Sequence, residues 1–123
     1  MAEPKRRVLL VDDSATVLKH LGKILEASGR YEVVGTARNG LDGVKQFQSM
    51  RPEIVCLDIV MPELDGLQTL KLLLQVDPNV RVVMVSSIAG LAEMVRNCLE
   101  AGARNVVSKP FDERKVIEIL DGI

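Results

Sequence analysis

Five short apolar runs divide the chain, and each is followed by a segment with helical periodicity. The runs are rich in β-branched residues and are continuously apolar, which indicates strands that are buried on both faces. Such strands are typical of parallel sheets, in which each crossover helix packs against one face of the sheet. The pattern therefore predicts a (βα)5 fold, a doubly wound five-stranded parallel sheet with helices on both faces.

Turn and capping residues mark the boundaries of these segments, and no repeat or low-complexity stretch interrupts them. Ser14 can cap the first helix, Asn39-Gly40 forms a turn, and Asp77-Pro78 ends the third helix. The predicted strands cover residues 7–11, 32–37, 53–57, 81–85 and 104–108, and the predicted helices cover 15–27, a short stretch around 41–47 that stops before Pro52, 67–75, 91–100 and 112–120.

The overall composition indicates an ordinary globular domain. At 123 residues we expect a single domain over residues 1–123, with its core from about 7 to 120. A formal net charge of -1 argues against a nucleic-acid-binding surface built on bulk positive charge. No apolar run reaches the ~20 residues of a membrane span. The N-terminus lacks a signal-peptide pattern, and Cys56 and Cys98 are expected as reduced thiols that are buried or half-buried, so we predict a cytoplasmic protein.

Polar residues follow four of the apolar runs at the point where each run ends. Asp12 and Asp13 come after VLLV, Asp58 after IVCL, Ser86 after VVMV and Lys109 after NVVS. Because the carboxyl ends of parallel strands meet at one edge of a sheet, these side chains are expected to converge. Crowded carboxylates raise one another's pKa unless a cation lies among them, which predicts a site for Mg²⁺, with Mn²⁺ as an alternative. The hydroxyl and the ammonium group then suit an anion.

Each of these residues, taken singly, also fits an ordinary structural role. Asp commonly begins a helix, and a serine or lysine after a strand is commonly a solvated loop residue. A helix cap requires only one such residue, and Ser14 can supply it, so the two consecutive acids before Ser14 are not explained by capping. Asp65 is better placed than Asp58 to begin the following helix. Asp58 is therefore predicted to act as a nucleophile toward a phosphoryl group.

Three neighbouring features complete the predicted site. The backbone carbonyl of Val60 is a candidate metal ligand. Ser87, next to Ser86, is a small residue that leaves the phosphoryl oxygens accessible to a hydroxyl. Lys109, held between a β-branched strand and Pro110, can balance the carboxylates and hold an anion.

The stretches VLLVDDS, LDIVMPELDG, VMVSS and VVSKPF resemble, in order and spacing, those of the response-regulator receiver domain of two-component signalling. The resemblance is of the chemotaxis-regulator type and covers about residues 7–120. It implies a flavodoxin-like fold and a phosphorylation-activated switch rather than an enzyme. Asp58 would accept a phosphoryl group from a sensor histidine kinase or a histidine phosphotransfer protein, in a Mg-dependent reaction.

The resemblance also implies roles for the other site residues. Asp13 and Asp58 would bind Mg²⁺ directly, and Asp12 would bind it through water. Ser86 would be the switch hydroxyl, and Lys109 the cation that contacts the phosphate. The peptide bond between this lysine and the following proline is expected to be cis.

Output is expected through a downstream protein partner, without direct contact with nucleic acid or membrane. The surface expected to change consists of the fourth predicted helix, the fifth strand and the last helix, and the protein would be a monomer or a phosphorylation-dependent dimer. Leu91, Met94 and Val95 are candidates for a small docking patch on the fourth helix. Both a stand-alone regulator and the receiver of a larger regulator fit the sequence.

The chain departs from the receiver pattern at Val106. Receivers commonly carry an aromatic residue there, three positions before the lysine, and the ring swings inward as the switch hydroxyl moves. Val106 lacks that reach, so the coupling to output is expected to differ or to be weaker. Val60 and Ile88, two residues past Asp58 and Ser86, are predicted to shield the acyl phosphate from water and slow its loss.

Two alternatives use related chemistry. A haloacid-dehalogenase-like phosphatase also forms an aspartyl phosphate with Mg²⁺, but it requires a DxD pattern at the first strand, where this chain has adjacent acids. A flavodoxin-like cofactor carrier is disfavoured because the acidic loop after the first strand would repel a flavin phosphate.

Overall fold

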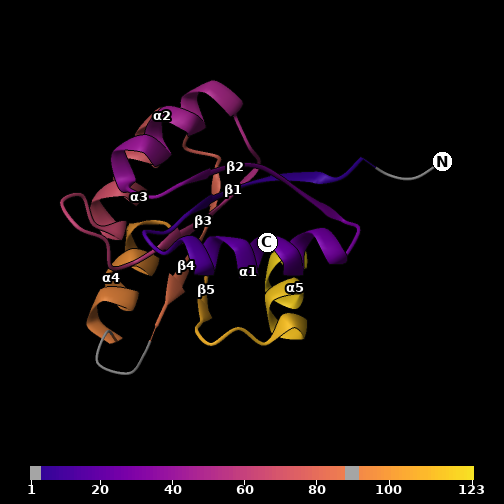
Figure 1. Ribbon diagram of the computed structural model, residues 1–123. Helices are drawn as coiled ribbons and strands as arrows, with labels where there is room; N and C mark the ends of the chain where they lie inside the picture. The colour runs from indigo at the N-terminus through magenta and orange to yellow at the C-terminus, as the bar shows by residue number, and fades with distance from the viewer. Residues whose placement is uncertain (1–3, 88–91) are drawn as a thin grey trace.

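The computed structural model describes residues 4–87 and 92–123, in which five strands form one parallel sheet with the order β2-β1-β3-β4-β5 (Figure 1). The predicted (βα)5 architecture is confirmed, because a helix follows each strand. The strands are β1 Arg6–Val11, β2 Tyr31–Ala37, β3 Ile54–Asp58, β4 Arg81–Ser86 and β5 Asn105–Ser108. The helices are α1 Ala15–Ala27, α2 Gly40–Met50, α3 Gly66–Val76, α4 Ala92–Ala101 and α5 Glu113–Asp121.

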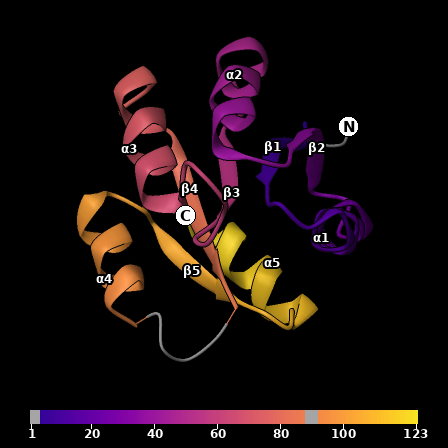
Figure 2. The same cartoon turned by 60° about the vertical axis from the view of Figure 1, so that its left-hand side comes forward.

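Helices cover both faces of the sheet, as predicted from the continuously apolar strands. Leu9 and Val11 of β1 belong to the hydrophobic cluster that packs under α2, α3 and α4. Val8 and Leu10 belong to a second cluster with residues of α1 and α5. Figure 2 shows α1 and α5 together on one side of the sheet. Alternate residues of each strand therefore bury their side chains on opposite faces.

Side-chain caps fix where the helices begin. Ser14 caps α1 by accepting a hydrogen bond from the Val17 N–H at 3.3 Å. Asn39, predicted as part of a turn, is the N-cap of α2, and Asp65 caps α3 in a capping box with Gln68. Because a cap is the residue just before a helix, these contacts place the helix starts within about one residue of the prediction. The second helix runs to Met50 and so stops before Pro52, as predicted.

The register of the sheet aligns the carboxyl ends of the strands. Val11 lies opposite Leu57 of β3, and Asp58 lies opposite Val85 of β4. Ser86 lies opposite Ser108 of β5, directly before Lys109. Residues that are distant in the sequence are thereby brought to one edge of the sheet.

Gly66 lets α3 begin directly behind the end of β3. A side chain at this position would place its Cβ 2.6 Å from the Ile59 Cα and would also collide with the Asp58 carbonyl. The Gly66 N–H donates to the Ile59 carbonyl at 2.8 Å. Only glycine fits this close approach of two backbones.

Other sequence predictions have mixed outcomes. Cys56 and Cys98 are free and buried, as expected. Met94 and Val95 are half-buried and pack against the core, so their predicted place in an exposed patch is wrong, and Leu91 lies outside the described residues. Among the described helices, none has both the length and the apolar character to cross a bilayer.

Candidate functional site

Three carboxylates meet at the carboxyl edge of the sheet, as the sequence predicts. Each of Asp12, Asp13 and Asp58 offers one oxygen atom, and these atoms lie within 4.8 Å of one another. Asp12 and Asp58 are only 3% and 5% exposed, whereas Asp13 is exposed. Asp12 directly follows β1 and Asp58 ends β3, and both strands lie inside the sheet, which explains the burial of these two carboxylates. The cluster is thus open to solvent on the side of Asp13.

Lys109 provides a cation inside this cluster. Its Nζ lies 3.1 Å from Asp12 Oδ2 and 3.8 Å from Asp58 Oδ1. The Lys109 N–H donates to the Ser86 carbonyl at 2.7 Å, and the Lys109-Pro110 peptide is cis, as expected. One ammonium group cannot neutralise three carboxylates, so negative charge remains at the site.

The hydrogen bonding of the Asp12 carboxylate indicates whether the site suits a metal ion. Its Oδ1 accepts the Ser14 N–H at 2.9 Å. Its Oδ2 is buried and, among the described residues, receives no hydrogen bond of good geometry, although Lys109 Nζ is close. A buried carboxylate oxygen without such a partner, beside two further carboxylates, is the hard-oxygen set that Mg²⁺ or Mn²⁺ prefers. The residues present therefore fit a hard divalent cation.

Asp58 has the perturbed acidity expected of crowded carboxylates. The pKa of Asp58 is raised from 3.8 to about 6; burial is the largest cause of the rise, and the negative charge of Asp12 is the next largest. Lys109 and the Val60 N–H, which donates to the Asp58 carboxylate, lower this pKa and offset part of the rise. The carboxylate is thus held ionised at neutral pH at a cost in free energy, which a bound cation would relieve.

The remaining predicted residues lie around the cluster. Ser86 is buried at the end of β4, and Ser87 is exposed beside it. Val60 is 52% exposed and lies two residues after the end of β3. The use of the Val60 carbonyl as a metal ligand stays a prediction, and Ile88 lies outside the described residues.

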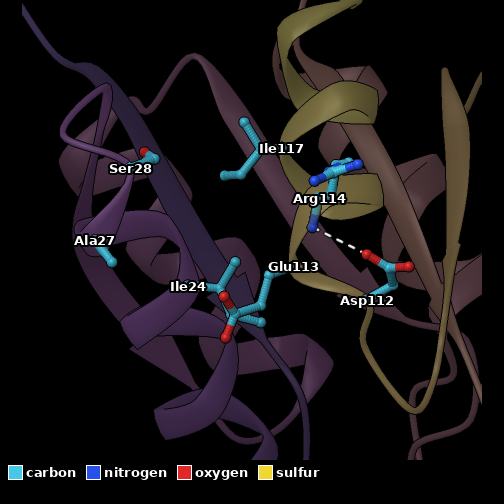
Figure 3. A pocket seen from close by; sticks show the side chains of 7 residues that line it. All are labelled: Ile24, Ala27, Ser28, Asp112, Glu113, Arg114 and Ile117. Carbon is cyan, nitrogen blue, oxygen red and sulfur yellow. Dashed lines mark hydrogen bonds between the residues drawn. The ribbon is translucent and has the colours of Figure 1, made fainter.

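Val106 lies away from the carboxylates, on the edge strand β5. It packs partly against the core and borders a groove of about 300 Å³, together with Lys115 and Ile119 of α5. A second, open groove of about 600 Å³ lies between α1 and α5, as Figure 3 shows. No residue of the predicted site lines this second groove. The carboxylate cluster and the groove between α1 and α5 are therefore separate features of the molecule.

Sequence reasoning missed Arg38, which follows β2. Its Nε and Nη2 donate to the Asp13 backbone carbonyl at 3.3 Å and 3.0 Å. The relevant signal was the position of Arg38 after a predicted parallel strand, because the residue after each strand reaches the same edge of the sheet. The prediction considered only the four strands that are followed by an acid, a hydroxyl or Lys109.

The fold and this site define a response-regulator receiver. The family model of the response regulator receiver domain matches residues 8–121, and the chain belongs to this family. The chain is similar to the chemotaxis protein CheY of Treponema pallidum, with 45% identity over 119 residues that cover 95% of this chain and 81% of the relative. It is similar to CheY of Thermotoga maritima, with 37% identity over 118 residues that cover 96% and 97% of the two chains.

Solved structures support the same assignment. The CheY chain of the CheX-CheY-BeF3-Mg complex from Borrelia burgdorferi matches with a TM-score of 0.87 and 34% identity, over 95% of this chain and 87% of that chain. The response regulator domain of Thermotoga maritima CheB matches with a TM-score of 0.84 and 34% identity, over 97% and 93%. The expected fold class and family are thus confirmed, and the chain is a receiver of the CheY type.

Proposed function

We propose that this chain is a phosphorylation-activated switch whose phosphoryl acceptor is Asp58. The observation that carries the proposal is the cluster of Asp12, Asp13 and Asp58 around Lys109 at one edge of the sheet. Within this cluster the Asp12 carboxylate is engaged by the Ser14 N–H and by Lys109. Asp58 ends the central strand β3, and its buried carboxylate lies 3.8 Å from Lys109 Nζ, which favours it as the nucleophile.

The metal ion of the proposed reaction is Mg²⁺, with Mn²⁺ as an alternative. Asp13, Asp58 and the Val60 carbonyl would hold it directly, and Asp12 would hold it through water. When bound, it would neutralise the carboxylates and polarise the phosphoryl oxygens. The donor set and the buried Asp12 Oδ2 support this assignment.

In the proposed reaction, each residue of the site has a separate role. The Asp58 carboxylate attacks the phosphorus of a phosphohistidine; a phosphorus–oxygen bond forms, the phosphorus–nitrogen bond breaks, and the histidine leaves. Lys109, close to Asp58, neutralises the charge of the transferred group. The Ser86 hydroxyl binds a phosphoryl oxygen, and Ser87 leaves access to it.

Phosphorylation replaces the single negative charge of the Asp58 carboxylate by a phosphoryl group that carries roughly two, in a site that is already acidic. We propose that Ser86 and Lys109 then move toward the phosphoryl group and shift α4, β5 and α5 toward an active arrangement. Val106 has no ring to insert, so this step proceeds without the aromatic movement that other receivers use.

The proposed partners are a sensor histidine kinase or phosphotransfer protein upstream and a protein target downstream. The Borrelia relative is described in a complex with CheX, which supports output through protein contact. We propose that the chain works as one receiver domain in the cytoplasm, as a monomer or as a dimer formed on phosphorylation. The haloacid-dehalogenase-like alternative is not retained, because the chain belongs to the receiver family and has no DxD pattern at β1.

Intact mass spectrometry after incubation with acetyl phosphate and Mg²⁺ tests the assignment of Asp58. The wild type is expected to gain one phosphoryl group, and Asp58→Asn is expected to gain none. Asp65→Asn is the matched control, since asparagine caps a helix as well as aspartate and this variant should be modified like the wild type. Modification of Asp58→Asn at the wild-type level would show that another residue is the acceptor.

A further inference from the structure

Arg38 lies outside the set of residues that the proposed function uses, yet it holds the loop that carries two of the acids. Its guanidinium donates twice to the Asp13 carbonyl, at 3.3 Å and 3.0 Å. One residue earlier, the Asp12 N–H donates to the Ala37 carbonyl of β2 at 3.0 Å. The loop after β1 is thus held to the end of β2 at two consecutive residues.

The two acids of this loop are fixed in different ways. The Asp12 carboxylate is buried and has contacts of its own, with the Ser14 N–H and with Lys109. The Asp13 carboxylate is exposed, and across residues 4–87 and 92–123 it forms no side-chain hydrogen bond or ion pair. Its position relative to the other carboxylates therefore depends on its backbone, which Arg38 contacts.

We infer that Arg38 is a positioning residue for Mg²⁺, because it fixes the backbone from which Asp13 reaches the site. This inference rests on the proposed function. A guanidinium places two N–H groups on one acceptor in a fixed plane, whereas a lysine has the same charge without this geometry. A ligand set held in place before binding loses less conformational freedom when the ion arrives.

The charge of Arg38 acts in the opposite direction to its geometry. A positive charge beside a cation site repels the incoming ion, so charge alone predicts that removing Arg38 strengthens Mg²⁺ binding. The positioning role predicts weaker binding. Charge repulsion and positioning can be told apart in two ways. Arg38→Lys keeps the charge but loses the geometry of the guanidinium, and high salt screens the charge in any variant.

Calorimetric titration with MgCl₂ measures the effect on the full chain without phosphorylation. Arg38→Lys is expected to bind Mg²⁺ about three- to fivefold more weakly than the wild type, because the Asp13 backbone is then no longer fixed before the ion arrives. Arg38→Gln at high salt should also bind more weakly. Arg104→Lys, at another exposed arginine, is the matched control and should bind like the wild type. Metal-free melting temperatures of all variants are expected to stay close together.

Each contrary outcome has a definite meaning. Equal Mg²⁺ dissociation constants for the wild type and Arg38→Lys, or tighter binding by Arg38→Gln at high salt, overturn the positioning role alone. A lower metal-free melting temperature of Arg38→Lys with unchanged Mg²⁺ binding assigns the contact to stability and also overturns it. If the wild type itself binds no Mg²⁺, the metal site of the proposed function fails, and the inference fails with it.

Discussion

The two ends of the sheet carry polar clusters of opposite character. At the amino end, Asp121 accepts hydrogen bonds from the Tyr31 hydroxyl and from Arg30, whose Nη2 lies 2.7 Å from Asp121 Oδ2. Arg6 donates to the Leu120 and Ile123 carbonyls at the end of α5, at 3.2 Å and 3.4 Å. At the carboxyl end, three carboxylates lie together, and the Lys109 ammonium group contacts two of them, Asp12 and Asp58.

The difference shows which cluster serves the fold and which serves binding. At the amino end, the Asp121 charge is matched by a guanidinium and by a hydroxyl, and Arg6 lies favourably against the end of a helix dipole. At the carboxyl end, excess negative charge is retained at a cost in stability, and Asp12 Oδ2 has no hydrogen bond of good geometry among the described residues. Such retained cost is typical of a site prepared for a ligand.

Replacing Lys109 should have the largest effect on stability. Lys109→Met removes the only cation that the structure records in contact with the buried Asp12 and Asp58, and breaking such a pair costs about 3 kcal/mol. Urea unfolding without metal should show this loss, and saturating Mg²⁺ should recover part of it. Lys115→Met, at an exposed lysine on α5, should change stability by less than about 0.5 kcal/mol. Equal losses in the two variants would contradict the role of Lys109 in charge balance.

Asp58→Asn should change stability in the opposite direction. The pKa of Asp58 is raised from 3.8 to about 6 in the folded chain, mainly by burial, so the folded state holds the proton more tightly than the unfolded state. The ionised Asp58 carboxylate therefore destabilises the folded chain above about pH 6, and this penalty is lost as the pH falls from about 6 to about 4. A rise of about two pKa units, at about 1.4 kcal/mol for each unit, corresponds to a penalty of about 3 kcal/mol. Because asparagine is still a buried polar group, Asp58→Asn should recover about 2 kcal/mol of this penalty at pH 7.5 without metal.

Urea unfolding at pH 4.5 and 7.5 checks this prediction by comparing the two proteins at each pH. The advantage of Asp58→Asn should shrink at the lower pH and should also shrink when Mg²⁺ is added to both. A constant difference between the two proteins across this pH range would argue against a strained carboxylate.

At the amino end, Asp121→Ala should cost about 2 kcal/mol, because it leaves the buried Tyr31 hydroxyl without its acceptor. Mg²⁺ should leave this loss unchanged, since the variant lies at the end of the sheet away from the carboxylates. Glu118→Ala, at an exposed residue of the same helix, is the control for lost charge and helix propensity. Recovery of Asp121→Ala by Mg²⁺ would mean that the two ends are coupled.

The smallest effect is expected on the lifetime of the phosphoryl group. Val60, 52% exposed beside the acceptor, is predicted with Ile88 to keep water from the acyl phosphate. Val60→Asn together with Ile88→Glu should shorten the phosphoryl half-life, measured by intact mass after the donor is removed. Leu99→Asn, at an exposed apolar residue of α4, should leave the half-life unchanged. An unchanged half-life in the double variant would rule out shielding.

The periodicity of the sequence was sufficient to predict the fold and the convergence of the carboxylates. Buried strands are continuous apolar runs, and a parallel arrangement places the residues that follow them at one edge. What escaped prediction depends on side-chain contacts between segments. Arg38 has no motif of its own, and Met94 and Val95 were assigned to an exposed patch because helical spacing alone does not show which helix face meets the core.

Gly66 has a consequence for how this receiver can be redesigned. Helix α3 starts so close behind the end of β3 that a methyl group at this residue would collide with the backbone of Asp58 and Ile59. The end of β3 therefore has no space to move toward α3. A combinatorial library around this site should therefore keep glycine at position 66 and vary other positions.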